Sequence, residues 1–147
     1  MIPVTTARLV HPAAAALAGV AEIFDQYRRH YGEPVVAGQA LAWLADQAGS
    51  GKLTVFTAHA GADLAGIATA ATLPASLRLG CYWQLRDLYV VPGARRRGAG
   101  HALVSAVRAA ASAAGAIRLS VQTEADNTAA LQLYRTSGFT PVSQVAE

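Results

Sequence analysis

The stretch VVPGARRRGAGHALV (residues 90–104) joins a β-branched run, which stops at Pro92, to an alanine-rich segment with the composition of a helix. Three adjacent arginines (Arg95, Arg96 and Arg97) stand at this joint together with glycines. The free N–H groups at a helix start and the helix dipole bind anions, and arginine adds positive charge. Glycine lets a phosphate approach the backbone because it has no Cβ. The stretch therefore predicts a strand-to-helix joint suited to a pyrophosphate.

Two common phosphate-binding motifs do not fit this joint. A P-loop requires G-x-x-x-x-G-K-[ST], but Ala99 and Gly100 stand where the lysine and the hydroxyl residue belong. A dinucleotide-binding fingerprint requires G-x-G-x-x-G, and Leu103 replaces its third glycine. Taken alone, the RRRGAG segment is also compatible with a plain solvated loop.

The composition indicates one globular domain over residues 1–147, with 53% hydrophobic and 14% charged residues. The single cysteine, Cys81, excludes an internal disulfide framework and a cysteine-based zinc site. The histidines have no metal-ligand spacing, so no metal site is expected. No apolar run approaches the ~20 residues of a membrane span, and no signal-peptide layout is present. We therefore expect a cytoplasmic protein without a membrane partner.

The net charge is only +3, and Lys52 is the only lysine. Arginine suits a planar, bidentate grip on phosphate or carboxylate. Because the positive charge is concentrated in one arginine cluster and not in a basic stripe interleaved with aromatic residues, we expect no nucleic-acid partner.

Hydrophobic periodicity and turn residues predict the element order β-α-α-β-β-β-α-β-α-β. The expected strands are 4–10, 53–60, 64–72, 82–91, 117–123 and 139–145. The expected helices are 12–30, 39–47, 101–114 and a last one from Asp126 or Asn127 to Gly138. Hairpin strands come first and a strand-helix-strand crossover follows, so the prediction is an α/β fold with a mixed sheet and helices on both faces.

The pattern V-x-P-x-x-R-x-x-G-x-G resembles the pyrophosphate loop of the GCN5-related N-acetyltransferase (GNAT) family. Arg95, Gly98 and Gly100 fall on the family's Q/R-x-x-G-x-G/A signature. A second block, NTAALQLYRTSGF (127–139), resembles the family's N-x-x-A-x-x-L-Y-x-x-x-G-F segment. One helix and one strand separate the two blocks, as in the family.

The resemblance extends more weakly to YRRHYG (27–32) and LRDLYV (85–90), which are similar to a bacterial clade of small acetyltransferases near the diamine acetyltransferases. It covers about residues 4–140 in all. It implies an acyl-CoA N-acyltransferase fold with a central mixed sheet, and an enzyme.

The resemblance also implies acetyl-CoA as the cofactor. Backbone amides of the loop would hold the pyrophosphate, and pantetheine would fill a gap beside the preceding strand. A backbone N–H near Val90 would polarise the thioester carbonyl. The residues expected to bind the cofactor are Leu88, Tyr89, Val90, Val91, Arg95, Arg96, Arg97, Gly98, Ala99, Gly100, His101, Asn127 and Tyr134.

The resemblance assigns Tyr134 the role of general acid toward the leaving thiolate. A tyrosine with a pKa near 10 is protonated at neutral pH, which suits that role. The alternative is a core aromatic residue on an amphipathic helix. Acetyl transfer would be direct, in a ternary complex and without a covalent intermediate, to a primary amine of a small molecule or a peptide.

The chain departs from the resemblance at the position of the general base. The diamine acetyltransferases carry a glutamate where this chain has Arg86. Asp87 remains, as a base or as a group that orients the ammonium. Its alternative is an ion pair with Arg86, Arg78 or Arg28. Arg86 favours an acceptor that bears a carboxylate, such as an amino acid, over a polyamine.

The acceptor site is expected to include residues late in the first helix. The predicted acceptor residues are Tyr27, Arg28, Tyr31, Arg86 and Asp87. The alternative for the two tyrosines is core packing, and for Arg28 it is a solvated helix face.

Few residues follow Gly138, where family members usually have two more strands or one long strand. The acceptor pocket is therefore expected to be open or to be completed by a second subunit in a homodimer. A second interpretation of the whole chain is a sensor of the same fold that binds CoA without catalysis.

Overall fold

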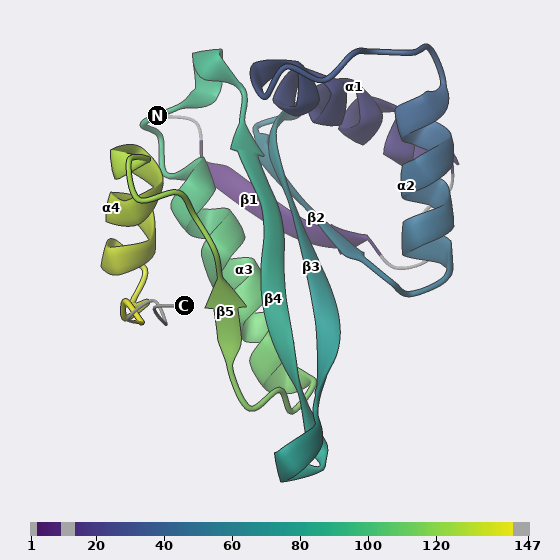
Figure 1. The fold of residues 1–147 in the computed structure, drawn as a ribbon. Coiled ribbons are helices and arrows are strands. Elements are labelled where there is room, and N and C mark those ends of the chain that lie inside the picture. Colours follow the sequence, from purple (N-terminus) through teal and green to yellow (C-terminus); the bar gives the residue numbers. More distant parts are fainter. Residues whose placement is uncertain (1–2, 10–13, 143–147) are drawn as a thin grey trace.

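In the computed structural model, which describes residues 3–9 and 14–142, a five-stranded sheet has the order β1-β2-β3-β4-β5 (Figure 1). The elements in chain order are β1 (Val4–Leu9), α1 (Ala14–His30), α2 (Gln39–Gly49), β2 (Thr54–Ala60), β3 (Asp63–Ala75), the short 3₁₀ helix η1 (Ser76–Arg78), β4 (Gly80–Val90), the 3₁₀ helix η2 (Pro92–Ala94), α3 (Ala99–Ala113), β5 (Leu119–Val121) and α4 (Thr128–Thr136).

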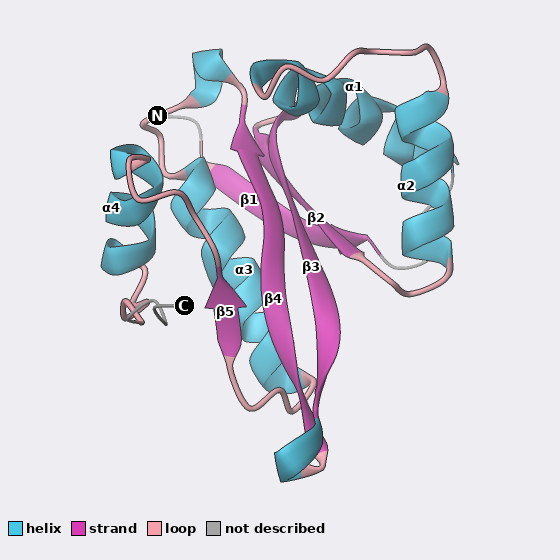
Figure 2. Cartoon of the chain, viewed as in Figure 1, coloured by secondary structure: helices cyan, strands magenta, loops and turns pink. Residues whose placement is uncertain are grey.

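The sheet is mixed, as the sequence predicts. Strands β1 to β4 pair antiparallel, and β4 pairs with β5 in parallel. The parallel pairing covers only Trp83↔Leu119 to Leu85↔Val121, whereas β4 continues to Val90. The two strands therefore diverge toward the carboxyl end of β4, as Figure 2 shows beside β5.

A β-bulge interrupts β4 at Arg86. Asp87 lies opposite Thr69 and Leu85 lies opposite Ala70, so Arg86 is an extra residue with no partner in β3. A bulge of this kind re-aims the side chains that flank it. Leu85 packs in the core under α3, whereas the next residue after the bulge, Asp87, contacts α1 on the other face.

Helices cover both faces of the sheet, which confirms the prediction. One core lies between the sheet and α3, where Leu103, Val104 and Val107 are fully buried. The other lies under α1 and α2 and contains Leu17 and Leu44, also fully buried. Full burial of such a side chain stabilises the fold by about 1.5–3 kcal/mol. β4 contributes side chains to both cores and is held from two sides.

Several element boundaries differ from the prediction. The segment between the expected strands 64–72 and 82–91, which contains Pro74, is part of a long β3–β4 hairpin that turns at η1. Pro74 lies opposite Cys81 near the hairpin end, where a missing N–H costs little. The helix expected from His101 begins two residues earlier, and the strand expected over 117–123 is limited to β5, because β4 moves away beyond Val121.

The strand predicted over 139–145 is wrong for residues 139–142, which have no strand structure, and 143–145 lie outside the described residues. The Phe139 N–H donates a hydrogen bond back to the Tyr134 carbonyl over 2.9 Å. The Phe139 ring packs against the edge of the Tyr134 ring, with 5.6 Å between centroids. The chain therefore turns back under α4 instead of extending along the sheet.

Within residues 3–9 and 14–142, no helix combines the length and apolar character needed to cross a lipid bilayer.

Candidate active site

A groove of about 1510 Å³ opens where β4 and β5 diverge. Its walls come from β4, β5, α3, α4 and the C-terminal end of α1. The predicted site residues that line it are Tyr27, Tyr31, Arg86, Asp87, Leu88, Tyr89, Val90, Arg95, Gly100, Asn127 and Tyr134. The predicted site residues outside this lining are Arg28, Val91, Arg96, Arg97, Gly98, Ala99 and His101. The fold thus brings the predicted acid and most predicted acceptor residues to one groove.

The Asp87 carboxylate is held by two hydroxyl groups. The Tyr27 Oη donates a hydrogen bond to Asp87 Oδ1 over 2.9 Å, and the Thr69 Oγ1 donates to Asp87 Oδ2 over 2.5 Å. Thr69 is fully buried on β3, and sequence reasoning missed it. A threonine inside an otherwise apolar strand segment is the signal that could have found it. The two bonds set the orientation of the carboxylate in the groove.

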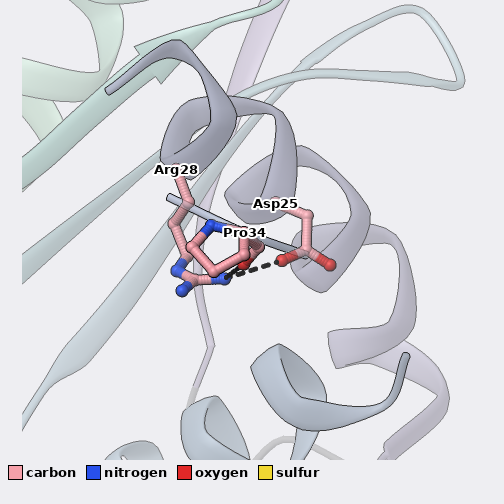
Figure 3. A network of polar contacts seen from close by, with 3 residues as sticks. All are labelled: Asp25, Arg28 and Pro34. Atoms are coloured by element: carbon pink, nitrogen blue, oxygen red, sulfur yellow. Dashed lines mark hydrogen bonds and ion pairs between the residues drawn. The ribbon is translucent and has the colours of Figure 1, made fainter. Parts of the chain in front are cut away.

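The arginine partners weighed for Asp87 are not the ones observed. Arg86 Nη1 donates to Gln84 Oε1, and Arg28 Nη1 donates to the Pro34 carbonyl over 3.0 Å and lies 3.4 Å from Asp25 Oδ1. Figure 3 shows the Arg28 side chain directed to Asp25 and Pro34. Arg28 is therefore the one predicted acceptor residue that does not line the groove.

Tyr27 keeps its proton well beyond neutral pH. Burial raises the pKa of the Tyr27 hydroxyl above its ordinary value, and the charge of Asp87 and the hydrogen bond to it raise the pKa further. The Tyr27 ring also lies 5.4 Å from the Tyr31 ring and 5.8 Å from the Tyr89 ring, between centroids. The hydroxyl is thus a permanent donor to Asp87 within an aromatic wall.

Tyr134 lies on α4, half-buried and on the lining of the groove. Burial raises the pKa of its hydroxyl, and the nearby Tyr31 hydroxyl adds to the rise. A protonated hydroxyl in the groove can give a proton to a leaving group. The contact with Phe139 shows that the same ring also packs in the core.

The arginine-rich stretch forms the turn that leads into α3. Gly98 precedes the helix with a φ of 85°, in the left-handed region that favours glycine. The Ala102 N–H donates to the Gly98 carbonyl over 2.9 Å. This is the first hydrogen bond of the helix. The N–H groups of residues 99–101 precede it in the chain, so they have no acceptor within the helix. The geometry is that of an anion-binding helix start.

Arg95 is exposed, but its side chain contacts the end of β4. Its Nε donates to the Val90 carbonyl over 2.9 Å, and its guanidinium lies over the Tyr89 ring, 5.4 Å from the centroid. The side chain therefore covers the end of β4 and connects the turn to the aromatic wall. Arg96 and Arg97 are exposed beside the helix start.

Asn127 caps α4, because its Oδ1 accepts a hydrogen bond from the Ala130 N–H over 3.2 Å. Its side-chain NH₂ remains a donor on the lining of the groove. The cap explains the residue type without any ligand, and its place on the groove is compatible with the predicted contact to pantetheine.

The end of α4 is fastened to α3 through contacts that sequence reasoning missed. Arg108 Nη1 donates to the Ser137 carbonyl, and Ser137 Oγ lies 3.0 Å from Nδ1 of His101. Gly138 has a φ of 94°, and a Cβ there would lie 2.8 Å from the Arg108 guanidinium. The glycine of the second motif therefore allows both the turn and the close approach of Arg108.

No group of three or more His, Cys, Asp or Glu side chains that could hold a metal ion occurs in the part of the chain that the structure describes. The polar side chains that line the groove include a protonated tyrosine, an oriented carboxylate and several arginines.

Known acetyltransferases resemble this chain in sequence and in fold. Residues 17–139 match the model of the Acetyltransferase (GNAT) family. The uncharacterized N-acetyltransferase YhfO of Bacillus subtilis (strain 168) is 32% identical over 122 residues, which are 83% of this chain and 82% of YhfO.

Solved structures agree with the sequence comparison. A crystal structure of a probable acetyltransferase matches with a TM-score of 0.84 at 25% identity, over 99% of this chain and 94% of its own. The aminoglycoside acetyltransferase meta-AAC0020, from an uncultured soil metagenomic sample, shares the fold with a TM-score of 0.82 at 19% identity, over 98% of this chain and 93% of its own. With both sequence motifs inside the matched residues and both at the groove, the chain belongs to the GNAT family and is an acetyltransferase.

Proposed function

We propose that this acetyltransferase uses acetyl-CoA and transfers the acetyl group directly to a primary amine of a small molecule or a peptide. The observation that carries the proposal is the divergence of β4 from β5 after Leu85↔Val121. It opens a groove that extends from the unpaired part of β4 to the α3 side of the sheet.

The residues present fit a CoA-type cofactor. The N–H groups of residues 99–101 have no acceptor within α3 and suit the pyrophosphate. Beyond Leu85, β4 has no pairing with β5, so its backbone edge on that side is available to an extended pantetheine chain. Arg95 lies at the end of β4 and adds positive charge there. Bound acetyl-CoA would supply an activated acetyl thioester.

The chain's own residues supply the proton chemistry. Tyr134 holds a proton at its Oη, and in our proposal it is the general acid for the leaving sulfur. Asp87 orients the acceptor's ammonium group or takes its proton, directly or through a water molecule. Each carboxylate oxygen has a second lone pair beyond the bonds from Tyr27 and Thr69, so the group can accept a further hydrogen bond.

The test is release of free thiol from acetyl-CoA in the presence of amino acids, polyamines, aminoglycosides and a lysine peptide, with CoA binding followed by calorimetry. We expect CoA binding and thiol release that depends on an amine. Tight CoA binding without turnover on any amine would favour the CoA-binding sensor instead. Absence of CoA binding would overturn the proposal.

A further inference from the structure

Arg86 occupies an unusual place in the groove. It is the extra residue of the β4 bulge. Its neighbours Leu85 and Asp87 pair with β3, whereas Arg86 itself stands outside the regular alternation of side chains between the two faces of the sheet. It is exposed and lies on the lining of the groove, immediately before the oriented carboxylate. A charged side chain at that point can meet whatever binds beside Asp87.

The guanidinium of Arg86 keeps most of its binding capacity. Its Nη1 donates over 2.9 Å to the neutral Gln84 Oε1, and among the described residues its remaining N–H groups have no protein acceptor. No carboxylate of the described residues lies within ion-pair distance of it. The adjacent Asp87 is already engaged by Tyr27 and Thr69. An arginine with free, coplanar donors suits a carboxylate ligand.

The charge around the groove opposes a polycationic acceptor. Five arginines line it, against two acidic side chains; the seven residues are Arg86, Arg95, Arg108, Arg118, Arg135, Asp87 and Glu124. Arg95 lies at the proposed cofactor end, whereas Arg86, beside Asp87, repels an amine with several positive charges and attracts an anionic group. The acceptor end also has the aromatic wall of Tyr27 and Tyr31, which favours an apolar body.

We infer that the acceptor carries a carboxylate beside its primary amine, as an α-amino acid with an apolar side chain does, and that Arg86 selects it by binding that carboxylate. Arg86 and Asp87 are consecutive, so they present opposite charges at neighbouring points of the groove, matching a zwitterion. This inference rests on the proposed function.

The experiment compares matched amines that differ only in the carboxylate: phenylalanine with 2-phenylethylamine, and leucine with 3-methylbutylamine. For the wild type we expect the higher kcat/KM with the carboxylate member of each pair. In Arg86→Gln the ratio of the two kcat/KM values should fall about ten- to hundredfold, the effect of losing a charge-assisted hydrogen bond. The loss should appear mainly as a higher KM for the amino acid.

Arg78→Gln is the matched control. Arg78 is an exposed arginine in η1, outside the groove lining, so its replacement should leave the ratio unchanged. Arg86→Glu should move the preference toward diamines. Equal or better wild-type turnover of the decarboxylated amines, or of polyamines only, would overturn the inference and leave the proposed function standing. Absence of thiol release with every amine would overturn both.

Discussion

At the scale of single residues, three protonated hydroxyl groups determine the polar character of the groove around Asp87. Thr69 and Tyr27 both donate to Asp87, and the two bonds come from different elements, β3 and α1. Tyr134 faces the same groove from α4. Because burial raises the pKa of both Tyr27 and Tyr134, neither loses its proton in the neutral range.

Replacing Thr69 by valine should lower the free energy of unfolding by about 1–3 kcal/mol, because a half-buried carboxylate loses a donor. Chemical denaturation measures the effect. Thr57→Val is the matched control: Thr57 is also buried, but its hydroxyl has no hydrogen-bond partner among the described residues, so its loss should be neutral or stabilising. Equal destabilisation by the two substitutions would show that the bond to Asp87 contributes nothing.

Tyr134→Phe separates the two roles of that ring. Loss of a general acid should lower kcat about 10²- to 10⁴-fold while the Kd for CoA stays near the wild-type value. Steady-state kinetics and calorimetry give the two quantities. Because phenylalanine preserves the edge contact with Phe139, an unchanged kcat would assign Tyr134 to core packing alone.

At the scale of elements, the proposed function depends on how β4 ends and α3 begins. The bulge at Arg86 places Asp87 toward α1, and the divergence from β5 leaves the rest of β4 unpaired on one side. The turn at Gly98 then directs the first N–H groups of α3 away from their own helix. In the proposed function, the strand edge and the helix start bind the two ends of the same cofactor.

Gly98→Glu should abolish CoA binding, because it places a negative charge at the helix start where the pyrophosphate is expected. The positive φ adds a backbone strain of about 1–2 kcal/mol. Gly51→Glu is the matched control, because it adds the same charge at a glycine that also has a positive φ, 77°. An added Cβ there meets nothing within 4 Å, as at Gly98. Calorimetry should show loss of CoA binding only in Gly98→Glu. An equal loss of CoA binding in both variants would mean that backbone strain, and not the charge at the helix start, causes it.

At the scale of the whole molecule, the sheet separates two hydrophobic cores. The groove lies at the edge of the sheet where β4 and β5 diverge. Figure 1 shows α1 and α2 against one face and α3 against the other, with α4 next to α3. Tyr27 and Tyr134 come from opposite sides of this arrangement, and both are half-buried. Unfolding of the whole chain exposes them together.

This common exposure predicts an alkaline loss of stability. Below pH 10 both tyrosines are protonated in the folded and the unfolded chain, and the stabilisation from their raised pKa values is fully present. Above the unfolded pKa of 10.0, the unfolded chain releases protons that the folded chain keeps, so the free energy of unfolding falls as pH rises.

Ultraviolet absorbance of tyrosinate measures the titration of the five tyrosines. In the folded protein, two tyrosines should ionise at a pH above the ordinary range of the side chain. In the double variant Tyr27→Phe, Tyr134→Phe, these two ionisations should be the only ones missing. The protein in denaturant, where all five should titrate together, serves as the reference. Titration of all five together in the folded state would contradict the prediction.

Local sequence was sufficient for much of the fold and part of the site. The class of fold, the helices on both faces and the strand-to-helix joint before α3 follow from short windows, because periodicity, caps and glycines act on neighbouring residues. The second motif also predicted Tyr134 and Asn127 as site residues, and both line the groove.

Tertiary structure alone decided the bulge at Arg86, the partners of Asp87 and the path of the chain after Gly138. The partners of Asp87 stand 60 and 18 positions away along the chain. Which side chains meet across a sheet depends on strand register, because a shift of one residue moves every side chain of the strand to the opposite face of the sheet. Packing of whole elements sets that register, so no short window of sequence contains it.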